Sequence, residues 1–72
     1  MKKIKKIKIK LNGKNMSIDY GLNMYDLTNK LNIPIKKVAI EFNKEIINKK
    51  NIKRKKLKNN DVIEIVHFIG GG

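Results

Sequence analysis

The sequence contains no cysteine, and this absence excludes several kinds of chemistry at once. Without a thiol, the chain can form no disulfide framework, no cysteine-based metal site and no thiol nucleophile. Its single histidine, His67, has no second histidine or cysteine nearby in sequence, so we interpret it as a residue at the fraying end of a strand. We therefore expect no metal and no cofactor, and any reactive sulfur must come from another molecule.

Long apolar runs are also absent. Met1-Lys2-Lys3 resembles the start of a signal peptide, but lysines recur at positions 5, 6, 8 and 10 and interrupt the apolar run that a signal peptide needs. No segment is long and apolar enough to span a membrane. We expect a cytoplasmic protein with no membrane partner.

The chain has little arginine. Its formal net charge is +12, but Arg54 is the only arginine among 18 basic residues. Specific reading of bases favours the forked guanidinium of arginine, and the lysines are spread from Lys2 to Lys58. The four aromatic residues are too scattered along the chain to predict a platform for stacking bases. We interpret the charge as a solvated basic surface and predict no specific nucleic-acid partner.

The first half of the chain predicts a hairpin followed by a helix. Residues 3–11 alternate cleanly at their end, from Lys6 to Leu11, between lysine and apolar positions, as a half-buried strand does. Asn12-Gly13 favours a type I′ turn. A second strand over residues 15–20 should return antiparallel, with Met16 and Ile18 facing the core, and end at Gly21.

The helix should begin after Asn23 as N-cap, with Asp26 completing a capping box and Leu22 and Leu27 forming a hydrophobic staple. Asn32, followed by Pro34, predicts its end near Leu31. One helix face should enter the core, with Thr28 near its border; its members are Met24, Leu27 and Leu31.

The second half predicts three further strands. Residues 38–42 and 45–47 should pair through a tight turn at Asn43-Lys44. Residues 49–58 indicate an irregular, solvated crossing with one helical turn, anchored by Ile52 and Leu57. A turn at residues 59–61 leads into a last strand over residues 62–68.

Alternation in this last strand places Glu64 on the same face as Val66 and Phe68. Because a charged side chain should face water, we expect Ile63 and Ile65 to enter the core. Val66 and Phe68 then become exposed apolar residues, and together with Glu64 they form a candidate docking surface for a partner.

The last strand leads into Ile69, Gly70, Gly71 and Gly72. Three glycines contribute no side chain to a core, but the slim backbone from Ile69 to Gly72 could reach roughly 13 Å beyond the sheet at about 3.3–3.6 Å per residue. We expect residues 1–68 to form one domain and residues 69–72 a flexible tail. The carboxylate of Gly72 is the candidate reactive group, and no side chain is a candidate catalyst.

The order of two strands, a helix and three strands indicates an α+β domain with a mixed sheet of four to five strands packed on one helix. A chain of 72 residues has room for little more. This is the ubiquitin-like β-grasp arrangement, in which we expect the last strand to lie parallel to the first at the centre of the sheet.

Several stretches carry a resemblance to a known family: residues 11–13, 23–31, 38–43, Leu57 and, above all, the ending over residues 61–72. Through them, nearly the whole chain resembles the ThiS family of sulfur carriers in thiamine biosynthesis. The chain departs from the family pattern at Asn48, where the family often has Pro, at Ile52, where it often has Trp, and at Asn60, where it often has Gly; all three are turn or packing positions.

The resemblance implies a carrier that is a substrate and not an enzyme. An E1-like adenylyltransferase of the ThiF type would use ATP to join the Gly72 carboxylate to AMP. A persulfide donor would then supply sulfur, and the resulting thiocarboxylate would serve a thiazole synthase of the ThiG type. Residues 69–72 would be the segment inserted into these enzymes.

Two alternatives remain at this point. The small subunit of molybdopterin synthase has the same fold and a Gly-Gly ending, although its ending is usually richer in Pro and Ala. A basic β-grasp module that binds RNA belongs to a different class, but such a module has no need of a free glycine terminus.

Overall fold

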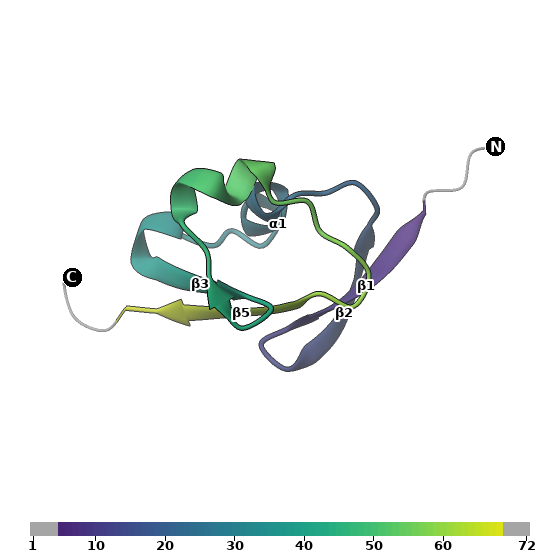
Figure 1. The fold of residues 1–72 in the computed structure, drawn as a ribbon, viewed down its shortest axis with the longest axis horizontal. Coiled ribbons are helices and arrows are strands. Elements are labelled where there is room, and N and C mark those ends of the chain that lie inside the picture. The colour runs from purple at the N-terminus through teal and green to yellow at the C-terminus, as the bar shows by residue number, and fades with distance from the viewer. Residues whose placement is uncertain (1–4, 69–72) are drawn as a thin grey trace.

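The computed structural model describes residues 5–68, and the expected tail over residues 69–72 lies outside that range. The domain consists of one sheet with a helix and a short 3₁₀ segment on the same side (Figure 1). No helix in the described range is long and apolar enough to cross a membrane. The elements, in chain order, are β1 (Lys6–Leu11), β2 (Lys14–Asp19), α1 (Met24–Lys30), η1 (Ile35–Lys37), β3 (Val38–Phe42), β4 (Glu45–Ile46), η2 (Lys49–Arg54) and β5 (Val62–His67).

The five strands lie in the order β2-β1-β5-β3-β4. β5 runs parallel to β1, with Leu11 opposite Ile63, and antiparallel to β3, with Ile40 opposite Ile65. The remaining neighbours, β1 with β2 and β3 with β4, are antiparallel. The predicted mixed sheet, with its last strand parallel to its first at the centre, is confirmed.

Both tight hairpin turns place two consecutive residues in the left-handed region. At the β1–β2 turn, Asn12 has a φ of 49° and Gly13 a φ of 81°. At the β3–β4 turn, Asn43 and Lys44 have φ angles of 52° and 72°. Two positive φ angles in a two-residue loop match the type I′ turn expected at Asn12-Gly13, whose twist suits the flanking strands.

The start of α1 is capped as its sequence predicts. The N–H of Asp26 donates to Oδ1 of Asn23 at 2.7 Å, and the N–H of Asn23 donates to the Asp26 carboxylate at 3.0 Å. The helix ends at Lys30 with Leu31 as C-cap, and Asn32 follows with a φ of 56°. Side-chain oxygens therefore accept hydrogen bonds from two of the four N–H groups that have no partner within the helix.

One face of the sheet packs against α1 and η2, and it provides most of the core (Figure 1). Thr28, expected at the border of the helix face, is buried, and its hydroxyl donates to the Tyr25 carbonyl at 2.7 Å. The predicted anchors Ile52 and Leu57 are both buried. The buried apolar residues are Ile7, Ile9, Ile18, Met24, Leu27, Val38, Ile40, Phe42, Ile52, Leu57, Ile63 and Ile65.

Some boundaries differ from the sequence prediction. The crossing expected to be irregular contains a 3₁₀ helix over six residues, Lys49–Arg54, whose start is capped by the side chain of Asn48. A second 3₁₀ segment, η1, precedes β3 and was not predicted. β5 ends at His67, one residue earlier than expected, and β4 ends at Ile46.

Candidate functional site

Residues 62–66 of β5 alternate between exposed and buried side chains, whereas His67 at the end of the strand is exposed. Ile63 is fully buried and Ile65 is 8% exposed, whereas Val66 is 59% exposed. Glu64 is exposed on the same face as Val66. The predicted orientation of this strand is therefore confirmed, and the outer face of β5 presents apolar groups to solvent.

Phe68 follows the end of β5 and is also exposed. Its N–H donates to the Lys37 carbonyl at 2.9 Å, so the backbone keeps its pairing with the residue before β3. Its ring lies under the Lys49 ammonium, with 5.1 Å between Nζ and the ring centroid. Phe68 is thus accessible as predicted, but its ring contacts η2 as well as solvent.

Asn12 holds the middle of β5 from the side of β1. Its Oδ1 accepts the N–H of Ile65 at 2.7 Å, and its own N–H donates to the carbonyl of Ile63 at 2.9 Å. The turn residue between β1 and β2 therefore extends the pairing of β5 by one step beyond the last strand pair, Leu11 with Ile63. This side chain therefore helps to hold β5 on the side of β1, while β3 pairs with β5 on the other side.

A second polar cluster holds the beginning of β5. The carboxylate of Asp61 is buried and accepts the N–H of Lys58 at 2.6 Å and Nδ2 of Asn43 at 3.1 Å. Oδ1 of Asn43 in turn accepts the N–H of Val62 at 2.8 Å. These bonds satisfy a buried carboxylate, which would otherwise be costly, and they tie the β3–β4 turn to β5.

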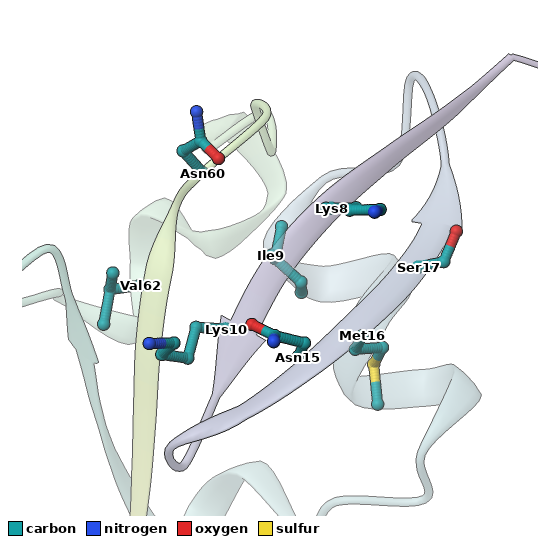
Figure 2. A pocket seen from close by; sticks show the side chains of 8 residues that line it. All are labelled: Lys8, Ile9, Lys10, Asn15, Met16, Ser17, Asn60 and Val62. Atoms are coloured by element: carbon teal, nitrogen blue, oxygen red, sulfur yellow. The ribbon is translucent and has the colours of Figure 1, made fainter.

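The outer face of the sheet is apolar over part of β5 and becomes basic and polar over β1 and β2. Lysines from β1 and polar side chains from β2 lie beside each other, because Lys8 is opposite Ser17 and Lys10 is opposite Asn15. A pocket lies in this region, and Figure 2 shows Asn60, just before β5, and Val62, at the start of β5, beside the β1–β2 hairpin. The residues that line the pocket are Lys8, Ile9, Lys10, Asn15, Met16, Ser17, Asn60 and Val62.

Every aromatic ring in the chain lies under a lysine ammonium. The distances from Nζ to the ring centroid fall between 4.7 and 5.1 Å, within the range of a cation–π contact. Part of the lysine excess therefore lies over ring faces, although Tyr20 and Phe68 remain 60% and 52% exposed. The pairs are Lys5 with Tyr20, Lys49 with Phe68, Lys53 with Tyr25 and Lys55 with Phe42.

Three features near β5 escaped prediction from the sequence. The side-chain bonds of Asn12 and Asp61 join residues far apart in the chain, and both residues were interpreted only as parts of turns. Glu41 lies directly opposite Glu64 across the β3–β5 pair. The outward position of Glu41 can be inferred from alternation within residues 38–42. That it faces Glu64 can be inferred only once the register of β3 against β5 is known.

Comparisons with known proteins agree with this geometry. The chain is 44% identical over 71 aligned residues to a protein named sulfur carrier protein ThiS from Bacillus subtilis, covering 89% of this chain and 98% of that one. It is 38% identical to part of a thiazole synthase from Magnetococcus marinus, covering 92% of this chain and 20% of the synthase.

A solved structure shares the fold. The crystal structure of thiamine biosynthesis protein ThiS from Geobacter metallireducens matches with a TM-score of 0.81 and 28% identity, covering 92% of this chain and all of that one. The domain is therefore a ubiquitin-like β-grasp domain, as predicted. The family model for ThiS matches residues 9–72, and the chain belongs to the ThiS family.

Proposed function

We propose that this protein is a sulfur carrier that delivers sulfur for thiazole formation in thiamine biosynthesis. The observation that carries the proposal is the similarity to the Bacillus subtilis sulfur carrier, which extends over 98% of that chain. The role is that of a substrate for other enzymes.

The partner that consumes the sulfur is a thiazole synthase of the ThiG type. Support comes from the Magnetococcus marinus thiazole synthase, in which the region similar to this chain makes up 20% of the protein. A carrier-like segment and a synthase joined in one chain have a high effective concentration for each other. The same pairing between separate chains would require a docking surface.

The group that carries sulfur is the carboxylate of Gly72. A carboxylate is a poor electrophile, so an adenylyltransferase of the ThiF type first joins one of its oxygens to the α-phosphorus of ATP, and pyrophosphate leaves. The terminal sulfur of a persulfide then attacks the acyl carbon and AMP leaves, which gives an acyl disulfide. A thiol attacks the donor's own sulfur in that disulfide, so the S–S bond breaks, the donor sulfur and the thiol form a new disulfide, and the thiocarboxylate remains on Gly72.

The segment inserted into the partner enzymes comprises Ile69, Gly70, Gly71 and Gly72. Glycine has no Cβ, so the backbone can enter a slot too narrow for other residues. Val66, Phe68 and Glu64 form the docking surface beside it, since all three are exposed at the end of the strand that leads into this segment. The domain then orients the tail while the tail brings the reacting carbon to the enzyme.

The test is intact-mass analysis after incubation with the adenylyltransferase of the same organism, ATP and a persulfide donor. We expect a mass increase equal to the exchange of one oxygen for sulfur, confined to the C-terminal peptide. A reaction without ATP is the control and should leave the mass unchanged. Sulfur on an internal residue, or no ATP-dependent change with an adenylyltransferase that is active on its own carrier, would contradict the proposal.

A further inference from the structure

Two carboxylates lie opposite each other on the outer face of the sheet. Glu41 on β3 and Glu64 on β5 are partners in the strand register, which places their Cβ atoms about 4.5–5.5 Å apart. Like charges directly opposite in a sheet destabilise it. In a chain with 18 basic and only 6 acidic residues, this juxtaposition is conspicuous.

The six acidic side chains fall into two groups. Asp19, Asp26 and Asp61 each bind a group within the domain: the Lys6 ammonium, the start of α1 and the turn before β5. Glu41, Glu64 and Glu45 make no side-chain hydrogen bond or ion pair within residues 5–68. The opposed pair therefore has no structural role in the described domain that would offset its repulsion.

Apolar side chains surround the carboxylate pair. Val66 lies one step along β5 on the same face, with Ala39 opposite it on β3. On the other side of Glu41, the register places Ile46 of the edge strand β4, which is 78% exposed. The pair is thus set in an exposed apolar surface, where an approaching protein would displace water and strengthen any charge interaction.

The basic side chains of this sheet face lie on the other side of β5. Val62 is opposite Lys10 on β1, and Lys8 lies further along that strand (Figure 2). The outer face is therefore divided into a lysine half over β1 and β2 and an apolar half with two carboxylates over β5, β3 and β4. A partner that presents a cation therefore meets carboxylates over the second half, whereas it meets the lysines of β1 over the first.

We propose that the apolar half of this face docks onto a surface of the adenylyltransferase that presents an arginine, whose guanidinium binds between Glu41 and Glu64 while apolar side chains beside it cover Val66, Ala39 and Ile46. This inference rests on the proposed function. Arginine suits the site because its planar fork of N–H donors can serve two carboxylates at once, and it is less strongly hydrated than an ammonium group. The contact also sets the angle at which β5 directs the tail.

The experiment compares Glu41→Gln and Glu64→Gln with the parent chain in calorimetric titrations against the adenylyltransferase at two salt concentrations. Glutamine preserves the shape and removes one charge. We expect each variant to bind roughly tenfold more weakly, because the guanidinium loses a partner in a desolvated site. The melting temperature should stay the same or rise, since the repulsion between the carboxylates is removed.

Glu45→Gln is the matched control, because it makes the same change of charge on a carboxylate that faces away from the pair, opposite Phe42. It should bind like the parent. If all three variants changed the affinity equally, the overall field of the protein and not the pair would be responsible, and the proposal would be wrong. Equal affinity of parent, Glu41→Gln and Glu64→Gln would also overturn it.

The proposed function and this inference fail in different ways. A parent chain that is neither bound nor adenylylated would contradict the function itself. A parent chain that is adenylylated normally, with Gln variants that bind equally well, would leave the function intact and remove only the docking proposal.

Discussion

The carboxamide of Asn12 binds both backbone groups of Ile65. Oδ1 accepts the Ile65 N–H at 2.7 Å, and Nδ2 lies 3.4 Å from the Ile65 carbonyl oxygen. The parallel pairing of β1 with β5 stops at Leu11 and Ile63. The side chain of a turn residue thus takes the place of the next peptide group of β1 and keeps the central strand bonded on that side.

Asn12→Gly should lower the free energy of unfolding by about 1–2 kcal/mol, because the bonds to Ile65 are lost while the left-handed backbone is still accommodated. Asn32→Gly is the control. Asn32 has a similar φ of 56°, and its side chain makes no hydrogen bond within the described residues. Denaturant unfolding of both variants provides the comparison. Equal loss of stability in the two would show that the bonds of the Asn12 side chain to Ile65 do not stabilise the domain.

Ile65→Ala should destabilise the domain by roughly 2–5 kcal/mol, since it removes a buried side chain from the central strand.

Val66→Asp should leave the melting temperature nearly unchanged, because Val66 is exposed. It should weaken binding to the adenylyltransferase, because Val66 belongs to the proposed docking surface. Thermal unfolding and a binding titration on each variant measure both effects. A Val66→Asp protein that unfolds easily but binds normally would contradict the assignment.

Lys44→Gly should stabilise the domain by about 0.5–1 kcal/mol. Lys44 has a φ of 72°, a conformation that costs a residue with a Cβ about 1–2 kcal/mol, and part of the gain is offset by the greater freedom of glycine when unfolded. Gly13→Ala is the reverse test, because Gly13 has a φ of 81° and an added Cβ would meet no atom within 4 Å. Its expected destabilisation, seen by denaturant unfolding, would therefore come from the backbone alone.

The hydrogen bond from the Lys6 ammonium lowers the pKa of Asp19 below its ordinary value of 3.8. A carboxyl group whose pKa is lower in the folded state stabilises that state above its unfolded pKa, and this contribution is lost as the pH falls through the folded pKa. Asp19→Asn should thus unfold at a slightly lower temperature than the parent at neutral pH. The difference should begin to shrink near pH 3.8, disappear only as the pH falls through the lower pKa of the folded state, and shrink in high salt. A difference that persists in stronger acid would exclude the ion pair as its cause.

Deletion of Gly72 should abolish acyl-adenylate formation without affecting the fold. The shortened chain still ends in a glycine carboxylate, but that group is withdrawn by about 3.5 Å, more than a displacement reaction tolerates. Gly71→Val should have a similar effect by adding a branched side chain. ATP-dependent adenylate formation is the measurement, with circular dichroism to verify folding. Adenylylation of either variant at the parent rate would show that the enzyme does not require a tail of this length without a side chain at position 71.

The local features of the fold were predictable because their signals lie within a few residues of one another. The Asn12-Gly13 turn, the capping box between Asn23 and Asp26, and the alternation of Ile63 and Ile65 with Glu64 are all of this kind. Even the central position of β5 followed, since the order of elements restricts a small mixed sheet to few arrangements.

What could not be predicted depends on contacts between distant segments. Asn12 and Ile65 are 53 positions apart, and nothing near Asn12 indicates that its side chain binds a strand. The same holds for Glu41 and Glu64, whose opposition requires the register of β3 against β5. One helical turn was expected in the lysine-dominated run that holds η2, but apolar periodicity there is too sparse to indicate a 3₁₀ helix of six residues.

The central position of β5 also bears on synthesis of the chain. Strands β1 and β2 emerge from the ribosome first, and β3 and β4 follow, but the strand that joins these two hairpins is the last to appear. A nascent or truncated chain that stops before Val62 has two separate hairpins and no continuous sheet, and an isolated hairpin is marginally stable at best. Folding is therefore completed only when the strand that leads into the tail has been made, so partner enzymes should meet few folded domains that lack it.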